Sequence, residues 1–302
     1  MKNHLSNFYD YLRFEKHLSK NSILSYKRDV GLLQKYFLAL KLNNYDDISH
    51  EDIVDFLMVL HQKYSEASIS RILSSLRSFF KFLIRENIVK KNLFSEISNP
   101  KKPIKILKTL NEEDVINFLD RIPYSSDLEL RNKAMLEMLY SSGMRVSEIV
   151  DLKLNDIDYE QNYVRCTGKG NKERIVPIGK NAISFLKIYL KNSRLNIGKT
   201  EKLKSNPFIF LNKNGGKLTR QGFWKILKKL QKDLFTDKNI YPHLFRHSYA
   251  THMLERGADI RTVQELLGHS NISTTEIYTN INKKFIKESF FKHNPRGKIK
   301  KN

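Results

Sequence analysis

The chain has 302 residues, of which 40% are hydrophobic and 28% charged, as is ordinary for a folded protein. The charge balance is unusual, because 54 Lys and Arg against 32 Asp and Glu give a net charge of +22. Such an excess indicates an anionic partner, of which nucleic acid is the commonest, and leaves a basic membrane-surface protein as the alternative. A single cysteine, Cys166, excludes an intramolecular disulfide, and the apolar run Ile53–Leu60 is too short to span a membrane. We therefore expect a cytoplasmic protein.

Residues 1–98 show apolar residues at helical spacing throughout, which predicts a domain made of helices alone. One predicted helix begins at Ser49 and has acidic residues in its first turn, as a helix N-terminus favours. Another, over about residues 67–87, has a continuous apolar face, and its opposite face carries Arg71 and Arg77. A polar face of this kind is usually only solvated, so periodicity alone assigns it no ligand.

The segment Asn99-Pro100-Lys101-Lys102-Pro103 interrupts the helical pattern. Two prolines so close together prevent a helix from continuing and favour an extended, basic linker. We place this linker at 99–106, between an N-terminal domain at 1–98 and a C-terminal domain at 107–302. The N-terminal domain has 15 Lys and Arg against 11 Asp and Glu, so most of the excess positive charge lies in the C-terminal domain.

The C-terminal domain mixes helices with a small amount of β-structure. A capping box at Thr109 and Glu112 predicts its first helix, and a later helical pattern breaks at Gly143, which frees Arg145 to point away from the helix axis. The run NYVRCTGKGNKERIVPI predicts a β-hairpin whose glycine-rich tip carries Lys169, and PFIFL predicts a third strand. The fold class expected is mainly α with a small antiparallel β-sheet.

The following helix, TRQGFWKILKKLQKDL, carries Arg220 and Gln221 at its start. Side chains at a helix N-terminus can reach base edges in the major groove of DNA. We treat these two residues as candidate DNA contacts.

The segment from Tyr241 to Tyr278 concentrates histidine, arginine and tyrosine on short predicted helices. Pro242 suits the first turn of a helix that places His243 and Arg246 on one face, and Gly268 suits the left-handed residue that ends the next helix. A metal site is disfavoured, because no Cys or carboxylate stands at ligand spacing and arginine repels cations. An anion site fits better, since Arg and His both donate to phosphate oxygens and a tyrosine can act as a nucleophile.

Five motifs then stand in a fixed order along the chain: G-M-R-V-S-E at 143–148, G-K-G-N-K-E-R at 168–174, H-x-x-R at 243–246, L-L-G-H at 266–269 and a tyrosine at 278. On these motifs the chain resembles the tyrosine recombinase (phage integrase) family over nearly its whole length, and it is most similar to the bacterial Xer recombinases. The resemblance implies an N-terminal helical core-binding (SAM-like) domain and an α+β catalytic domain, which together form a C-shaped clamp on DNA.

The resemblance also implies the roles of the site residues. The catalytic set would be Arg145, Lys169, His243, Arg246, His269 and Tyr278, with Glu148 orienting Arg145 or a neighbour and with Arg71, Arg77, Arg220 and Gln221 as DNA contacts. Tyr278 would attack the scissile phosphate to give a 3′-phosphotyrosine, and a Holliday junction would follow. The two arginines would clamp the non-bridging oxygens, the histidines would assist proton removal and bind the phosphate, and Lys169 would protonate the leaving 5′ oxygen. Neither a metal nor a cofactor is implied.

The implied partners are a double-stranded recombination site, a homotetramer or a heterotetramer with a related recombinase, and a septal DNA translocase. The implied role is resolution of chromosome dimers before cell division. An integrase or resolvase of a mobile element is the main alternative, disfavoured because no long arm-binding extension precedes Lys2. Two further alternatives are a type IB topoisomerase and a catalytically silent architectural protein that binds DNA. A chain without Tyr278 or Arg246 would have favoured the architectural protein, and this chain has both residues.

Two further interpretations concern residues outside the catalytic set. The apolar face of the C-terminal segment, formed by Phe285, Ile286 and Phe290, either fills a pocket on a neighbouring protomer, as in the family, or packs in cis. The remaining side chains of interest are interpreted as packing residues: His247, His252 and Trp224.

Overall fold

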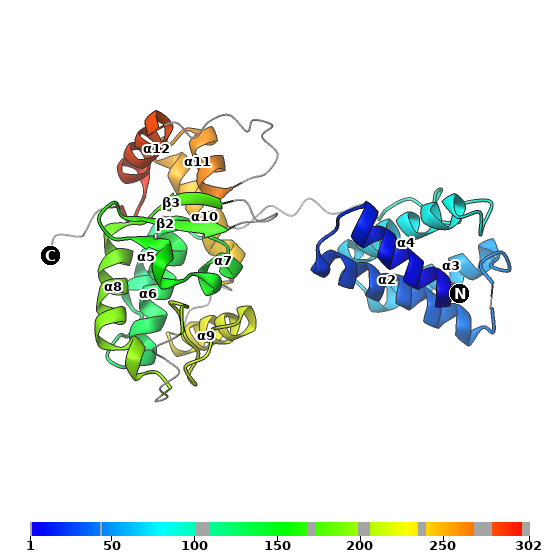
Figure 1. Ribbon diagram of the computed structural model, residues 1–302, viewed down its shortest axis with the longest axis horizontal. Helices are drawn as coiled ribbons and strands as arrows, with labels where there is room; N and C mark the ends of the chain where they lie inside the picture. The colour runs from blue at the N-terminus through cyan, green and yellow to red at the C-terminus, as the bar shows by residue number, and fades with distance from the viewer. Residues whose placement is uncertain are drawn as a thin grey trace. The chain divides into compact units, whose positions relative to one another are not determined.

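The computed structural model describes residues 2–42, 44–100, 109–167, 173–198, 206–234, 240–268 and 280–297. The chain divides into two compact units, Met1–Ile106 and Leu107–Asn302, each with its own hydrophobic core (Figure 1). Residues 101–108, which include most of the predicted linker, lie outside the described residues. Throughout the described ranges, no helix is both long and apolar enough to cross a membrane.

Among its described residues, the N-terminal unit has helices as its only regular secondary structure. Its helices are α1 (Lys2–Asp10), followed by a π-helical turn (Tyr11–Glu15), α2 (Lys20–Ala39), α3 (His50–Lys63) and α4 (Glu66–Arg85). The predicted start of α3 is confirmed, because Asp52 N–H donates to Ser49 Oγ (3.1 Å) and Ser49 N–H donates to Asp52 Oδ2 (2.9 Å). The predicted apolar face of α4 is also buried and forms the centre of this core: Ile69, Ile72, Leu73, Leu76, Phe79, Phe80 and Leu83.

The C-terminal unit surrounds α6, which is buried along most of its length and packs along α8 (Figure 1). Its helices are α5 (Glu112–Asp120), α6 (Asp127–Ser142), α7 (Val146–Asp151), α8 (Lys180–Asn192), α9 (Arg220–Asp233), α10 (Pro242–Glu255), α11 (Ile260–Leu267) and α12 (Asn280–His293). Its strands are β1 (Ile157–Asp158), β2 (Tyr163–Thr167) and β3 (Glu173–Pro177), antiparallel in the order β1-β2-β3. A mainly helical fold with a small antiparallel sheet is thus confirmed.

Two local predictions are wrong. The run 207–211 is not a third strand of this sheet: Phe208 forms an isolated bridge with Lys153, whose neighbours belong to a short 3-10 turn that offers no further ladder. The cap of α5 is also not Thr109. The helix begins two residues later than a Thr109 cap requires, so Asn111 takes the position and its Oδ1 accepts from Asp114 N–H (2.7 Å).

The C-terminal segment packs in cis. Phe290 is fully buried in the core of its own unit, and Ile286 packs against the same core. Beyond α12, Asn294 Nδ2 donates to Ser141 O (2.6 Å), and buried Arg296 donates from Nη2 to Asp120 Oδ1 (2.5 Å) and Glu137 Oε1 (2.7 Å). Of the two alternatives for the apolar face, this chain adopts the intramolecular one; the Phe285 side chain lies outside the described residues.

The buried partners of Arg296 predict a specific loss of stability. Arg296→Ala leaves Glu137, which is fully buried, with only Lys133 as a cationic partner at 3.2 Å. Because breaking a buried ion pair typically costs about 3–5 kcal/mol, we expect a clear fall in the melting temperature of the C-terminal unit. The matched control is Lys292→Ala, which removes the same charge from an exposed position of α12 and should change stability by less than about 0.5 kcal/mol. Equal melting temperatures for the two variants in calorimetry would contradict the assigned role of Arg296.

Candidate active site

Arg145 owes its position to the break between α6 and α7. Gly143 ends α6 with φ +60°, and a Cβ at this residue would lie 2.4 Å from the Tyr249 ring, so only glycine fits here. The break at Gly143 is therefore confirmed. Arg145 then has extended backbone geometry as the N-cap of α7, and its N–H donates to Glu148 Oε2 (2.8 Å). Its side chain leaves the helix axis and is 35% exposed.

Glu148 is the carboxylate on which the site is built. Arg145 Nη1 donates to its Oε1 (3.0 Å), and Arg174 donates to both of its oxygens, from Nη1 to Oε1 and from Nη2 to Oε2 (2.8 Å each). Burial alone would raise the pKa of Glu148. The hydrogen bonds and charge of Arg174, with those from Arg145, outweigh burial and hold that pKa below the usual carboxyl range.

Arg174 is a site residue that the sequence reasoning missed. It lies on β3 directly opposite Cys166 of β2, and both side chains are buried. Its Nε also donates to Leu266 O (3.3 Å), which joins the strand to the end of α11. A signal was available in the sequence, because an arginine stood at an inward-facing position of a predicted strand, where only a paired charge is tolerated.

Arg246 brings a third guanidinium to the same place. It is buried on α10 and donates from Nη1 to Gly143 O (2.6 Å) and from Nη2 to Leu267 O. Burial first, and then the charge of Arg145, lower the pKa of Arg246 to about 10, so it remains protonated at neutral pH. Its carbonyl partners fix its position but do not neutralise its charge.

The arrangement therefore carries an excess of positive charge. Three guanidiniums (Arg145, Arg174 and Arg246) gather around one carboxylate, Glu148, and Arg145 Nη2 also reaches Gly268 O at 3.4 Å. One carboxylate offsets one of the three positive charges, so this group of four side chains has a net charge of +2. Partly buried cations with donors to spare are suited to an anion with several oxygens, such as a phosphate diester.

His243 lies beside this cluster on the first turn of α10, whose predicted start at Pro242 is confirmed. The side chain is exposed and borders an open cleft of about 440 Å³ between α10 and α11, together with Arg246 and His247. His243 and Arg246 thus face the same cleft, as their spacing predicted. A histidine at the mouth of a cationic cleft can exchange protons with a bound ligand.

Three predicted catalytic residues, Lys169, His269 and Tyr278, lie outside the described residues. Their flanking residues are described. Lys169 belongs to the five-residue connection between paired Thr167 and Glu173, and His269 follows Gly268, whose positive φ of 66° ends α11 as predicted. The roles of these three residues stay predictions.

The predicted DNA contacts differ in their surroundings. Arg71 pairs with buried Asp29 and remains half exposed. Arg77 donates to the carbonyl oxygens of Phe94 (3.0 Å) and Ile97 and to Asn99 Oδ1 (3.1 Å), so it holds the end of the N-terminal unit. Two exposed residues begin α9, Arg220 and Gln221, and their contacts with DNA stay a prediction.

Of the residues interpreted as packing residues, Trp224 is 41% exposed, and Lys228 Nζ lies 5.6 Å from the centre of its ring. That interpretation is wrong for Trp224, because the buried face of α9 is formed by Phe223, Leu227 and Leu230, and Trp224 lies about 100° around the helix from Phe223. His247 is half-buried in the active-site cleft, and His252 is buried and hydrogen-bonded.

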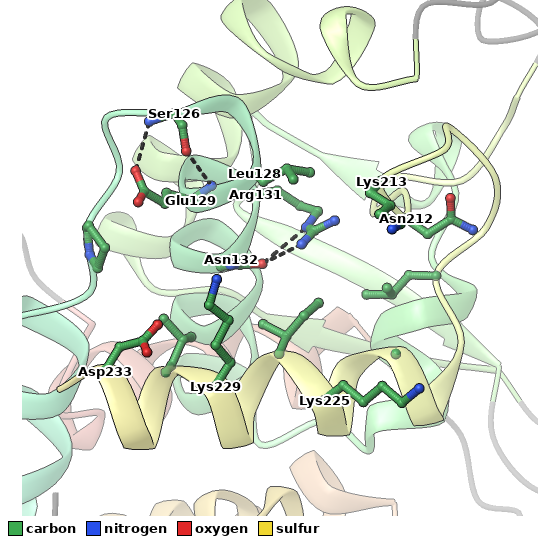
Figure 2. Close-up of a pocket in the computed structure, with 15 residues that line it drawn as sticks. Ser126, Leu128, Glu129, Arg131, Asn132, Asn212, Lys213, Lys225, Lys229 and Asp233 are labelled. Atoms are coloured by element: carbon green, nitrogen blue, oxygen red, sulfur yellow. Dashed lines mark hydrogen bonds between the residues drawn. The ribbon is translucent and has the colours of Figure 1, made fainter. Parts of the chain in front are cut away.

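A second cleft, of about 510 Å³, lies between α6 and α9 (Figure 2). Arg131 lies at its edge, donating to Asn132 Oδ1 (3.1 Å from Nε) and to Leu211 O (2.8 Å from Nη1). None of the described residues predicted for the site lines this cleft. Within the described ranges, no group of three or more His, Cys, Asp or Glu is placed to hold a metal ion.

Comparison with known proteins identifies the chain. Residues 108–284 match the family model described as "Phage integrase family", and residues 5–87 match "Phage integrase, N-terminal SAM-like domain". The chain belongs to the phage integrase family. The chain is 44% identical over 295 residues to a tyrosine recombinase XerD from Oceanobacillus iheyensis, covering 97% of this chain and 98% of the relative. It is 40% identical to a tyrosine recombinase XerC from Bacillus licheniformis, covering 98% of both.

Solved structures agree with this assignment. A XerH site-specific recombinase, in a post-cleavage complex with a palindromic difH substrate, has a TM-score of 0.69 and 25% identity to this recombinase. The match covers 94% of this chain and 83% of that one. The recombinase is therefore a tyrosine recombinase close to the Xer group, and it is a site-specific DNA recombinase.

The lowered pKa of Glu148 predicts how acid affects the recombinase. A carboxyl group whose folded pKa is depressed stabilises the fold above its unfolded pKa, about 4.3, and this contribution is lost as the pH falls through the lower folded value. Glu148→Gln should therefore lower the melting temperature at pH 7, and the difference from wild type should shrink in acid. Melting curves between pH 7 and pH 3 measure this. A difference that is constant across that range would show that the charge of Glu148 does not matter.

Proposed function

We propose that the recombinase cuts and rejoins DNA at a specific site through a covalent bond between Tyr278 and a 3′ phosphate. The observation that carries the proposal is the cluster of Arg145, Arg174 and Arg246 around the single carboxylate of Glu148. Its excess charge suits a phosphate diester, whose negative charge grows on the non-bridging oxygens as the nucleophile attacks. The known complexes of the XerH recombinase with difH DNA support DNA as the ligand.

The proposed first step is a transesterification in which one P–O bond forms and another breaks. The Tyr278 oxygen attacks the phosphorus, and its proton leaves with the help of His243, because a phenol with a pKa near 10 is mostly protonated at neutral pH. The 5′ oxygen departs with a proton from Lys169. Arg145 and Arg246 hold the non-bridging oxygens, and His269 donates to the phosphate. The 5′ hydroxyl of a partner strand then reverses the step and forms a Holliday junction.

The contacts of three described arginines support the roles proposed for them. Arg246 is held by two carbonyls and uses only two of its five donors for them, so it can still bind a phosphate oxygen. Arg145 is about one-third exposed and is oriented by Glu148, as the proposal requires. Arg174 locks Glu148 from the other side, and we assign it a positioning role.

The cellular role we propose is resolution of chromosome dimers before cell division. The curated relatives named XerD and XerC align over nearly the full length of the chain, which supports a Xer-type role over a mobile-element one. The recombinase would act in the cytoplasm as a tetramer on DNA, made of four copies or of two related recombinases. Activation by a septal DNA translocase belongs to the same proposal.

Salt dependence tests the proposed ligand. Most of the positive charge lies beyond residue 98, in the unit that holds the guanidinium cluster. Each phosphate that the recombinase neutralises should add roughly −0.9 to the slope of log K against log salt on duplex DNA. Arg220→Gln should make the slope shallower by about one if that residue contacts a phosphate. Fluorescence anisotropy on a half-site between 50 and 300 mM salt is the measurement, and a nearly flat response would count against DNA.

Paired variants test the chemistry. Tyr278→Phe removes a single oxygen, so DNA affinity should hardly change while covalent complexes with suicide-nicked sites disappear. Lys169→Ala should retain the nucleophile but cleave about 10²–10⁴ times more slowly, because the 5′ oxygen leaves without a proton. A 5′-bridging sulfur, which leaves without protonation, should restore cleavage to Lys169→Ala and not to Tyr278→Phe.

The outcomes separate the two roles. A protein–DNA adduct formed by Tyr278→Phe would mean that the nucleophile is another residue. Failure of the sulfur substrate to rescue Lys169→Ala, with wild type fully active on it, would remove Lys169 as the general acid.

A further inference from the structure

The side of α10 that faces away from the active site carries a regular row of polar residues. Ser248, His252 and Arg256, the last at the C-cap of α10, follow one another at intervals of four residues and so lie along one face. At about 100° per residue, Ser248 and His252 lie roughly 120–180° around the helix from Arg246 and His243, and Arg256 lies about 80° from Arg246. One helix therefore separates the active site from this second row.

All three residues bind residues near the start of the described part of the C-terminal unit. Leu110 N–H donates to Ser248 Oγ (3.0 Å), and His252 Nε2 lies 2.8 Å from Leu110 O. Arg256 Nε donates to Glu112 Oε2 (2.8 Å) at the start of α5. We name this set the linker-exit clamp: Ser248, His252 and Arg256 of α10, with Leu110 and Glu112.

The hydrogen bonds of His252 define its state. Its Nε2 faces a carbonyl oxygen, which only accepts, so this nitrogen carries the proton. Its Nδ1 forms a hydrogen bond with the Tyr140 hydroxyl of α6, at 2.8 Å. The ring is 1% exposed and both nitrogens have partners, so His252 is a fixed bridge between α6, α10 and Leu110.

The other end of the linker is held in a similar way. Arg77 of α4 donates to Phe94 O, Ile97 O and Asn99 Oδ1, immediately before residues 101–108. Each unit thus fixes its own end of the connection with side chains from a long helix. In the C-terminal unit, that helix is also the one that carries two proposed catalytic residues.

We propose that the linker-exit clamp positions α10, so that the placement of Arg246 and His243 depends on the contacts of this helix with Leu110 and Glu112. The inference rests on the proposed function of these two residues. A helix is stiff, and Arg246 lies only six residues from His252, or about 9 Å along the axis, so α10 moves as one body. Since misplacement of reacting groups by about 1 Å can lower a rate about a hundredfold, a loosened clamp should slow cleavage. Ser248, His252 and Arg256 are positioning residues that touch no DNA.

The first test measures α10 directly by amide hydrogen exchange in the DNA-free, full-length protein. His252→Phe fills the same space but cannot donate to Leu110 O, and exchange in α10 and at Leu110 should become about tenfold faster. Tyr140→Phe is the matched control: it removes the other hydrogen bond of the same imidazole and leaves Leu110 bound. It should lower the melting temperature comparably, while exchange at Leu110 stays within about twofold of wild type. His252→Gln, which keeps a donor, should restore most of the protection.

The second test measures single-turnover cleavage of a suicide-nicked site at saturating DNA. His252→Phe should cleave about tenfold more slowly with site affinity unchanged within about twofold, whereas Tyr140→Phe should cleave at the wild-type rate. The ion pair between Arg256 and Glu112 is exposed, so it allows a second form of this test that leaves the core undisturbed. Arg256→Glu should slow cleavage, and adding Glu112→Arg should restore it by forming the reversed pair.

The outcomes are distinct. If His252→Phe and Tyr140→Phe change exchange and cleavage alike, His252 acts through general stability and the clamp is rejected. If His252→Phe does not fold, Ser248→Ala and the reversed ion pair decide: wild-type exchange and cleavage in Ser248→Ala and Arg256→Glu would overturn the proposal. If the wild type forms no covalent complex, the proposed function fails, and the exchange measurements still decide whether the clamp holds α10.

Discussion

The pairing of Glu148 with Arg145 and Arg174 is the interaction on which the active site depends. Three guanidiniums repel one another, and burying them without a counter-ion would cost more than a fold of ordinary stability can tolerate. Glu148 offsets one charge and fixes the geometry of two guanidiniums, so the excess charge is held ready for an anion. A buried ion pair need not add stability over an apolar core. Its value here is that it joins α7, β3 and, through Arg174 and Leu266, the end of α11.

Helix α10 connects this cluster to the rest of the unit. One face carries His243 and Arg246, and the opposite face carries the linker-exit clamp. Contacts on both sides hold this helix, and the proposed dependence of the site on the clamp rests on them. A fully buried histidine needs partners for both ring nitrogens, and His252 finds them in Tyr140 and Leu110.

The C-terminal segment completes the same unit with a second buried ionic group. Arg296 bridges Asp120 and Glu137, and its carbonyl oxygen packs so closely on Gly179 that a Cβ there would lie 2.3 Å away. Exchange of this segment between protomers would therefore require Phe290 and Arg296 to leave buried positions. The cost of that exposure favours the intramolecular arrangement in an isolated chain.

The sequence by itself determined the local features and the family. Gly143 and Gly268 stop helices because they accept a positive φ, Ser49 and Pro242 start them, and periodicity marks the faces of α4 that become core. These signals act within a few residues, so they can be read without knowing the partners. The motif order added the family and the catalytic candidates, including the three that lie outside the described residues.

Only the tertiary structure decided which long-range partner each polar side chain takes. Arg174 meets Glu148 across 26 positions and His252 meets Leu110 across 142, and no local pattern distinguishes them from a solvated arginine and a packing histidine. Arg77 likewise turned toward its own backbone, and 207–211 lost its predicted strand because the segment beside it was too short to pair. Hydrogen bonds and ion pairs depend on contacts between distant segments, and those contacts exist only once the chain has packed.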